Sequence, residues 1–366
     1  MPNSNNCETQ STMSPWDESQ SLDKLQLQSD ACVHCGKCQE ACAFLKKYEM
    51  DLSDVSKLQE HVRGCFLCGK CSEVCPMGIH GDDIFKELRR MEIRDNTRDL
   101  KPYSFVLNEK HDYKFRNYRN ATSGSVLFPG CNFPSMFPKT NKYLEKVFRE
   151  HGIGTVYDCC GKPIAELGLY KGEERIVNRI SDDLTSRGIN EIVTMCPNCY
   201  YFLRNRIPQR VTSIYNKLQK LDILLKPVTE ASVYVPCPDR ESHEWYDQIA
   251  NIVGYQPEIL NNAQCCGLGG MASAEEPELA KSFAQSVLDA EKPCESCESS
   301  EGADKVVAEA KDRSGKGTLT TFCASCAGQF ARNGNSMPHI LSLLLGVDEK
   351  PATKTSYMHR VLTKFK

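Results

Sequence analysis

The sequence lacks any long apolar run. Across its 366 residues, no uninterrupted apolar stretch reaches the roughly 18 residues that a membrane-spanning helix needs. The longest candidate, residues 340–346, is far too short. We therefore expect no transmembrane helix in this chain.

A large excess of one charge is also missing. The formal net charge is −3, from 45 Lys and Arg against 48 Asp and Glu, so electrostatics give no argument for a nucleic-acid partner. Residues 113–119 interleave aromatic and basic side chains, which is a pattern also found at nucleic-acid contacts. We interpret this segment as aromatic packing between two domains instead. We predict no nucleic-acid partner.

The amino-terminal segment lacks both a basic start and an apolar stretch, so it does not have the pattern of a secretory signal. Its composition, rich in Asn, Ser, Gln and Thr, is typical of a disordered tail. We expect residues 1–21 to be such a tail, and we expect a cytoplasmic protein.

Cysteine, in contrast, is abundant, with 21 residues. A long chain with no secretory signal and an odd cysteine count does not suggest a disulfide framework. In a reducing compartment, clustered cysteines indicate thiolate ligands for metal. Eighteen of them fall into patterned groups, and Cys7, Cys294 and Cys297 do not.

Two cysteine runs near the amino terminus have the spacing of bacterial ferredoxins. In such a run three cysteines surround three corners of a cubane 4Fe–4S cluster, and the fourth cysteine ligates the other cluster. We therefore predict two cubanes, one on Cys32, Cys35, Cys38 and Cys75 and the other on Cys65, Cys68, Cys71 and Cys42.

Other residues of these runs support the same interpretation. Gly36 and Gly69 allow the backbone to approach the cluster closely. Zinc is the alternative, but a tetrahedral zinc site does not require the third and fourth cysteines at these offsets. We interpret His34, His61 and His80, in or near the loops, as surface histidines.

From residue 125 onward the sequence repeats itself. Each half contains a short strand pattern leading to a cysteine, a helix, an adjacent cysteine pair with glycine, a second helix, and a strand with a CxxC. Cys131 and Cys237 lie 106 residues apart, and so do Cys159 and Cys265. The CxxC motifs lie 127 residues apart, so the second copy carries an insertion, which we place at residues 291–317 on the surface.

This organisation predicts a mixed α+β and α/β chain. A mostly helical two-cluster module is followed by a duplicated α/β domain with pseudo-twofold symmetry. The expected units are a tail at 1–21, the helical module at 22–100, a linker at 101–124, the repeats at 125–231 and 232–346, and a carboxy-terminal tail at 347–366.

Each repeat offers five cysteines. Adjacent cysteines seldom form an unstrained disulfide, but two neighbouring thiolates can serve two irons of one larger cluster. Five thiolates also exceed what one zinc ion or one cubane uses. The two sets are Cys131, Cys159, Cys160, Cys196 and Cys199, and then Cys237, Cys265, Cys266, Cys323 and Cys326.

The doubled pattern Cys…Cys-Cys-Gly…Cys-x-x-Cys resembles the catalytic subunit of heterodisulfide reductase, and the ferredoxin-like module resembles that enzyme's iron–sulfur subunit. The resemblance covers about residues 22–346 and extends to the iron–sulfur subunits of anaerobic glycerol-3-phosphate dehydrogenase and glycolate oxidase. It implies a noncubane 4Fe–4S cluster on each five-cysteine set, with a disulfide split between the two clusters. The second CxxC departs from this pattern, because Ala324 stands where the first CxxC has Pro197. There are two alternatives for the five-cysteine sets. One is a single noncubane cluster together with another metal, and the other is structural zinc.

Two further motifs have weaker interpretations. Cys294-x-x-Cys297 lies in the charged insertion, and we favour an idle pair, with zinc binding or redox use as alternatives. Residues 267–272 formally match a dinucleotide fingerprint, but no buried strand leads into them. We interpret these glycines as allowing close backbone approach at the cluster.

The resemblance implies two candidate functions. The first is a heterodisulfide-reductase-like oxidoreductase subunit, in which electrons from the cubanes reach the paired noncubane clusters and reduce a small disulfide of the CoM-S-S-CoB kind. Its partners would be a flavin- or haem-containing donor subunit, with peripheral association to a membrane subunit left open. The second is an electron-relay subunit of a flavin-dependent hydroxy-acid or glycerol-3-phosphate dehydrogenase.

The cysteine sets predict an iron content. Anaerobically purified protein should contain about 16 iron atoms per chain, from four clusters of four irons each. Elemental analysis for iron and zinc measures this number. Iron near about eight atoms per chain together with stoichiometric zinc would contradict the noncubane assignment.

Overall fold

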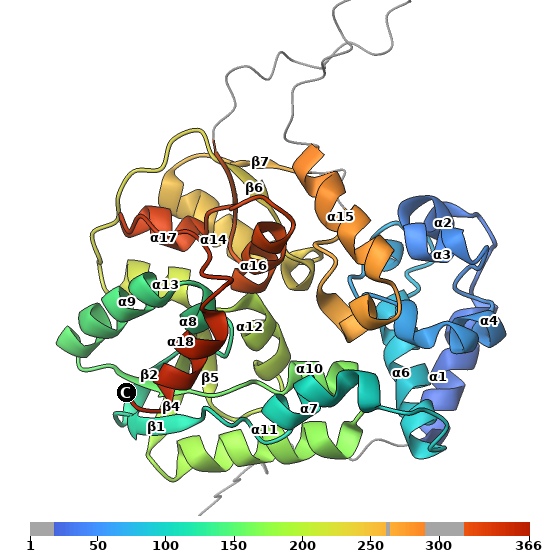
Figure 1. Ribbon diagram of the computed structural model, residues 1–366, viewed down its shortest axis with the longest axis horizontal. Coiled ribbons are helices and arrows are strands. Elements are labelled where there is room, and N and C mark those ends of the chain that lie inside the picture. The colour runs from blue at the N-terminus through green and yellow to red at the C-terminus, as the bar shows by residue number, and fades with distance from the viewer. Residues whose placement is uncertain (1–17, 261–263, 290–317) are drawn as a thin grey trace, which may run out of the picture.

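The computed structural model describes residues 18–260, 264–289 and 318–366. Figure 1 shows a helical module on one side, in blue, against a larger body built from both repeats. The expected α+β and α/β class is confirmed. The proposed insertion, residues 291–317, and Cys7, Cys294 and Cys297 lie outside the described residues.

The helical module packs short helices around the two ferredoxin-like runs. Phe44, Leu58 and Phe85 are buried in its core. In its longest helix, Ile84, Phe85 and Leu88 share one face and turn inward, as their spacing requires. The elements are α1 (Glu18–Asp30), α2 (Lys37–Ala41), α3 (Ala43–Lys47), α4 (Val55–Glu60), η1 (Val62–Gly64), α5 (Lys70–Glu73) and α6 (Gly81–Arg94).

The first repeat forms a five-stranded sheet in the order β1-β3-β2-β4-β5, parallel except for β1. Val126, Leu127 and Phe128 of β2 are fully buried, because helices cover both faces of a parallel sheet. Its strands are β1 (Asn117–Asn120), β2 (Gly124–Phe128), β3 (Gly154–Tyr157), β4 (Ile189–Thr194) and β5 (Arg210–Ser213), and its helices are α8 (Phe133–Met136), α9 (Pro138–Glu150), α10 (Lys162–Glu166), α11 (Tyr170–Thr185), α12 (Pro197–Leu203) and α13 (Ile214–Lys220).

The second repeat has the same order in a smaller parallel sheet, β7-β6-β8, which matches β3-β2-β4. A bridge between Thr321 and His339 takes the place of the β4–β5 pairing, and His339 then caps α17 as Ser213 caps α13. Its elements are β6 (Ser232–Tyr234), η3 (Cys237–Asp239), α14 (Glu244–Val253), β7 (Glu258–Ile259), η4 (Gly269–Ala274), α15 (Pro277–Asp289), β8 (Leu319–Thr321), α16 (Ala324–Arg332) and α17 (Ile340–Leu344).

The two repeats share one hydrophobic core. Leu127 and Val193 of the first repeat pack in the same cluster as Trp245, Phe322 and Leu341 of the second. All five side chains are fully buried. The repeats therefore form one body.

Three segments expected to be irregular contain regular structure. Helix α1 begins inside the expected tail, and residues 1–17 lie outside the described residues. The expected linker, 101–124, forms η2 (Lys101–Tyr103), α7 (Ser104–Lys110) and strand β1. The expected carboxy-terminal tail forms α18 (Ser356–Thr363).

The reason is apolar packing that local patterns do not reveal. Tyr113 and Phe115 are buried in one cluster with Cys131 and Cys159, and Val361 of α18 packs against it. The interpretation of residues 113–119 as packing aromatics therefore agrees with the structure. Both segments cover the first five-cysteine set.

The helical module and both repeats meet at one buried side chain, Arg89 of α6, which is 0% exposed. Its guanidinium donates hydrogen bonds to the Cys65 carbonyl at 2.7 Å, to the Glu166 carbonyl at 2.7 Å and to the Gly270 carbonyl at 2.7 Å. It also donates to the Val62 carbonyl, at 3.1 Å from Nε and 3.0 Å from Nη2. These acceptors belong to the module and to both repeats.

The glycines of the formal dinucleotide fingerprint lie at the same junction. A Cβ on Gly270 would lie 2.4 Å from the Cys65 carbonyl oxygen, and one on Gly269 would lie 2.5 Å from that of Phe66. Phe283 of α15 packs edge-on against Phe66, with ring centroids 4.8 Å apart. Figure 1 shows α15 between the second repeat and the helical module. These glycines therefore serve close backbone approach, as interpreted.

Across the described segments, none of the helices combines the length and the apolar character required to span a bilayer.

Replacing Arg89 with Met should destabilise the whole chain by about 3–5 kcal/mol, because it leaves buried carbonyls without a donor. Denaturant unfolding of the variant and wild type measures this difference. The matched control is Arg116→Met, which removes an exposed ion pair with Asp112 and should cost less than about 1 kcal/mol. Equal losses in the two variants would contradict the role given to Arg89.

Candidate metal centres

The first predicted cubane set comes together as expected. Cys32, Cys35 and Cys38 of the first run line one hollow with Cys75 of the second run. Cys35 is exposed, and Cys32 and Cys75 are half-buried. This hollow therefore lies at the surface of the molecule.

The second predicted set lines another, deeper hollow. It brings Cys65, Cys68 and Cys71 together with Cys42, and all four are buried. Gln264 of the second repeat reaches into it, with Nε2 donating to Cys42 Sγ at 3.3 Å and Oε1 accepting from the Ala43 amide at 2.9 Å.

The two ferredoxin-like loops share one backbone conformation. His34 and Leu67 occupy equivalent positions with φ of 51° and 50°, and Gly36 and Gly69 follow with φ of 75° and 70°. The amides of His34 and Leu67 each point at the first cysteine sulfur of their loop, at 3.4 Å. Positive φ outside glycine is uncommon and costs energy, so these turns are built to present amides to sulfur.

Of the three histidines, His34 lies at the rim of the outer cysteine hollow, and His61 and His80 line neither hollow. The His34 side chain is exposed, with Nδ1 2.8 Å from Asp51 Oδ2. His61 stacks on Tyr48, with ring centroids 3.7 Å apart, and His80 is exposed.

The first repeat brings its five predicted cysteines into one buried group. The thiol of Cys160 lies next to those of Cys159 and Cys199, and the thiol of Cys131 lies next to that of Cys159. Gly161 after the cysteine pair has φ of 93°, and a Cβ there would lie 2.9 Å from Ile176 of α11. The pair therefore requires glycine next in the chain.

The second repeat repeats this arrangement. The thiol of Cys326 lies next to those of Cys266 and Cys323. Gly267 has φ of 77°, and a Cβ there would lie 2.2 Å from the Ala280 carbonyl oxygen of α15. Cys323 precedes α16 with φ −122° and ψ 115°, close to the −127° and 123° of Cys196 before α12. The Ala324 departure from proline leaves the turn unchanged.

Two thiol contacts link separate sets. The thiol of Cys265 in the second repeat lies next to that of Cys68 in the helical module. The thiol of Cys196 in the first repeat lies next to that of Cys323 in the second. The deeper ferredoxin-like set, the second-repeat set and the first-repeat set therefore stand in series.

Buried cations flank the repeat sets. Lys110 and Arg360 lie beside Cys131, and Arg360 pairs with Glu109 at 2.5 Å. Arg240 likewise places a positive charge near Cys237 and Cys68. The buried Nε of Arg360 and Nη1 of Arg240 have no hydrogen-bond partner in the described chain.

These features fit iron–sulfur clusters. Burial raises the pKa of Cys42 and Cys237 to about 12, so without metal these thiols are neutral, whereas coordination ionises them. Thiolates are the ligands that such clusters use. An anionic cluster would accept hydrogen bonds from the unpartnered N–H groups of Arg360 and Arg240. The residues present fit the group.

The equivalent cysteines Cys131 and Cys237 differ in their surroundings. Cys131 is buried under Tyr113, Phe115 and α18. Cys237 is half-buried and lines a cavity of about 780 Å³ between the helical module and the repeats. The resemblance implied two facing clusters that a substrate reaches equally. In the described residues, the second set borders a cavity and the first set is covered.

The residues that make the surroundings of Cys131 and Cys237 differ were not predicted from the sequence. Arg360 lies in residues 350–366, which hold several Lys and Arg and no Asp or Glu, and that bias was a usable signal. Lys162 follows the first Cys-Cys-Gly, whereas Leu268 follows the second, which was also visible. Nothing local in the sequence marks Arg89.

Comparison with known proteins gives a family match. The cysteine-rich CCG domain matches residues 125–204 and again residues 232–311. The chain is 27% identical over 282 residues to one of the subunits of the fumarate reductase (CoM/CoB) of Methanothermobacter marburgensis, across 69% of this chain and 50% of that protein.

Two further relatives are more partial. An uncharacterized iron–sulfur protein of Methanocaldococcus jannaschii is 28% identical over 181 residues, across 45% of this chain and 37% of its own length. The EtfAB:quinone oxidoreductase of Syntrophomonas wolfei is 25% identical across 40% of this chain and 24% of its own length. The chain thus spans half or less of these relatives. No solved structure matches it significantly.

Two side chains that donate to sulfur allow each set to be tested separately. Gln264→Leu removes the donor to Cys42, and Asn198→Leu removes the Nδ2 donor 3.6 Å from Cys323 Sγ. Loss of a hydrogen bond to sulfur should lower the reduction potential of the cluster concerned. Redox titration followed by EPR should show one centre shifted in the first variant and a different centre shifted in the second. The same centre shifting in both variants would contradict the assignment.

Proposed function

We propose that this chain, which carries two CCG domains and is related to heterodisulfide-reductase-type proteins, is an iron–sulfur oxidoreductase subunit that passes electrons along its four cysteine sets to a small disulfide. The relationship expected from the cysteine pattern is confirmed by the family match. The observation that carries the proposal is the pair of thiol contacts, Cys68 with Cys265 and Cys196 with Cys323. They favour one continuous path through the chain.

The ligand assignments follow the predicted sets. In this proposal Cys32, Cys35, Cys38 and Cys75 hold the outer cubane, and Cys65, Cys68, Cys71 and Cys42 hold the inner one. Each five-cysteine set holds a noncubane 4Fe–4S cluster. When bound, the clusters supply one-electron transfer at potentials that their surroundings tune.

The chain's own residues hold and insulate this path. Most of the cysteines are buried, so water is kept from the sulfurs along it. Amides of His34 and Leu67 and the Gln264 side chain donate to sulfur. Reduction of a disulfide to two thiols consumes two electrons and two protons, and the electrons come from an external one-electron donor.

The surface around the outer set suits the entry of electrons. Cys35 is exposed there, beside the exposed side chains of Val33 and Met77. A small apolar rim next to an exposed ligand is suited to brief contact with a redox partner. We propose a flavin- or haem-containing donor subunit at this surface.

The alternative function is an electron relay for a flavin-dependent hydroxy-acid or glycerol-3-phosphate dehydrogenase. The relative named EtfAB:quinone oxidoreductase supports a subunit role of that general kind. Both functions use the same path, but the relay needs no substrate at the repeats. The cavity at Cys237 favours the disulfide reductase.

Iron-loaded protein given a strong one-electron donor dye should reduce a low-molecular-weight disulfide. Cys160→Ala and Cys266→Ala should abolish turnover, because disulfide cleavage takes two electrons and each variant removes a ligand from one of the two repeat sets that would supply them, while both cubanes remain reducible in their own module. Thiol release measures turnover, and EPR of the reduced variants measures the cubanes. If the loaded protein reduces none of a panel of disulfides yet exchanges electrons readily with a flavin dehydrogenase, the relay function is the correct one.

A further inference from the structure

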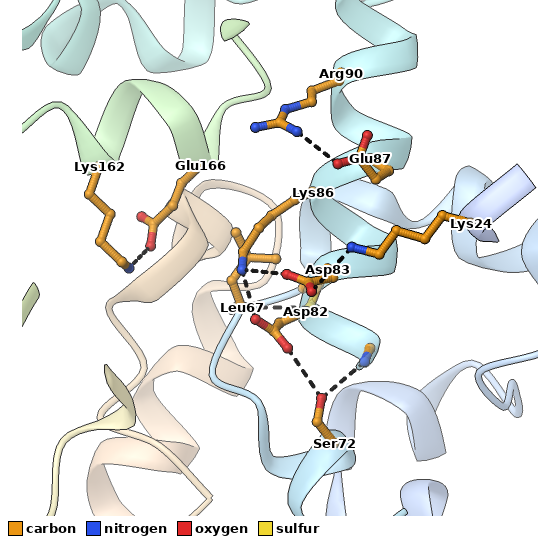
Figure 2. Close-up of polar contacts among 12 residues, drawn as sticks. Lys24, Leu67, Ser72, Asp82, Asp83, Lys86, Glu87, Arg90, Lys162 and Glu166 are labelled. Atoms are coloured by element: carbon orange, nitrogen blue, oxygen red, sulfur yellow. Dashed lines mark hydrogen bonds and ion pairs between the residues drawn. The ribbon is translucent and has the colours of Figure 1, made fainter. Parts of the chain in front are cut away.

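The cavity of about 780 Å³ lies where the helical module meets the two repeats. Helix α6 forms one wall and α10 faces it across the cavity, as Figure 2 shows with Lys86 and Asp82 on one side and Lys162 and Glu166 on the other. Cys237 and Cys68 lie in the wall, and no cysteine of the first repeat does. A molecule in this cavity therefore meets the second repeat's set and the deeper ferredoxin-like set, and not the first repeat's set.

Lys162 is the residue of α10 that distinguishes this cysteine set. It comes from the first repeat, yet it lines the same cavity as Cys237 of the second. Its ammonium also pairs with the Glu166 carboxylate. Leu268, at the equivalent place in the second repeat, offers no such group.

The charges of the walls are balanced in pairs. Lys86 pairs with Asp82 at 2.8 Å and with Asp83 at 3.1 Å. Arg90 and Arg206 pair with Glu173, at 3.1 Å and 3.5 Å.

The remaining arginine of the wall is paired as well. Arg240 Nε lies 3.5 Å from Glu73 Oε2, and Glu241 adds a further carboxylate to the lining. The cavity thus holds both signs of charge side by side and no unpaired group of cations among the described residues. A ligand with many negative charges would find no complementary surface, whereas one with ammonium and carboxylate groups would pair with both signs.

We propose that this cavity binds a small disulfide whose halves each carry an ammonium and a carboxylate group, with one sulfur at the second repeat's set beside Cys237 and the Lys162 ammonium next to the sulfur that leaves. This inference rests on the proposed function and adds the substrate class and a positioning residue to it. Cleavage of the S–S bond takes two electrons from the external donor, and each sulfur gains one proton. The Lys162 ammonium stabilises the negative charge that develops on the departing sulfur.

Three disulfides of the same core test the substrate class. They are cystine, its decarboxylated analogue cystamine, and its deaminated analogue dithiodipropionate. With the iron-loaded protein and a donor dye, kcat/KM should be about tenfold or more higher for cystine than for either analogue, because each analogue lacks one of the two charged groups that would contact the mixed charges of the walls. Equal or higher kcat/KM for dithiodipropionate would overturn the proposed class.

Lys162 is tested by Lys162→Met, with Lys162→Arg as the conservative variant. The Met variant should lose about tenfold or more in kcat with little change in KM, and the Arg variant should recover most of it. The control is Lys171→Met, which changes an exposed lysine of the neighbouring α11. Loss of the same size in Lys171→Met, or unchanged kcat in Lys162→Met, would overturn the role.

Occupancy of the cavity is measured separately by calorimetric titration of cystine into the oxidised, iron-loaded protein. Ala165→Phe places a ring in the cavity wall and should abolish the binding heat, while Tyr357→Ala on the exposed face of α18 should keep it. Both variants are compared at equal iron content. If wild type binds cystine without reducing it, and Ala165→Phe does not bind it, the cavity is the binding site and the reductase function is refuted. Turnover that persists in Ala165→Phe would refute the cavity and leave the function standing.

Discussion

The buried guanidinium of Arg89 is the constraint on which the rest of this structure depends. A cation removed from water is costly unless its donors are satisfied, and Arg89 satisfies them with backbone carbonyls from the helical module and both repeats. Burial lowers its pKa to about 10, so it remains charged at neutral pH. Because carbonyl acceptors are fixed by the backbone, the three parts of the chain meet in one geometry.

That geometry sets the distances between the cysteine sets. Arg89 donates to the carbonyl of Cys65. The backbone of Gly269 and Gly270 packs against the same loop, and it can approach so closely because neither residue has a side chain. The deeper ferredoxin-like set is thereby brought against the second repeat, where Cys68 contacts Cys265. The duplicated sheets, packed on one shared core, bring Cys196 against Cys323 in turn. Pseudo-symmetry ends at Cys131 and Cys237, since α18 covers the first and the cavity opens at the second.

Much of this could be predicted from sequence because the signals were local and repeated. The ferredoxin spacing predicted which cysteines would gather, and the structure brings Cys75 to the first run and Cys42 to the second. The 106-residue offset predicted a duplication, and both sheets share one strand order. What local patterns could not predict are contacts between distant residues. Arg89 resembles any other arginine of an amphipathic helix. The segment after α7 and helix α18 are ordered because Tyr113, Phe115 and Val361 pack on the first repeat beside Cys131 and Cys159.

Magnetic coupling between centres tests whether the two modules form one electron path. In partly reduced, iron-loaded protein, EPR should show the inner cubane split or broadened by a neighbouring paramagnetic centre in the repeats, while the outer cubane's strongest coupling is to the inner one. The thiol contact of Cys68 with Cys265 requires this result, because it places the two centres side by side. An inner cubane whose signal relaxes independently of the repeat centres at every level of reduction would contradict the account.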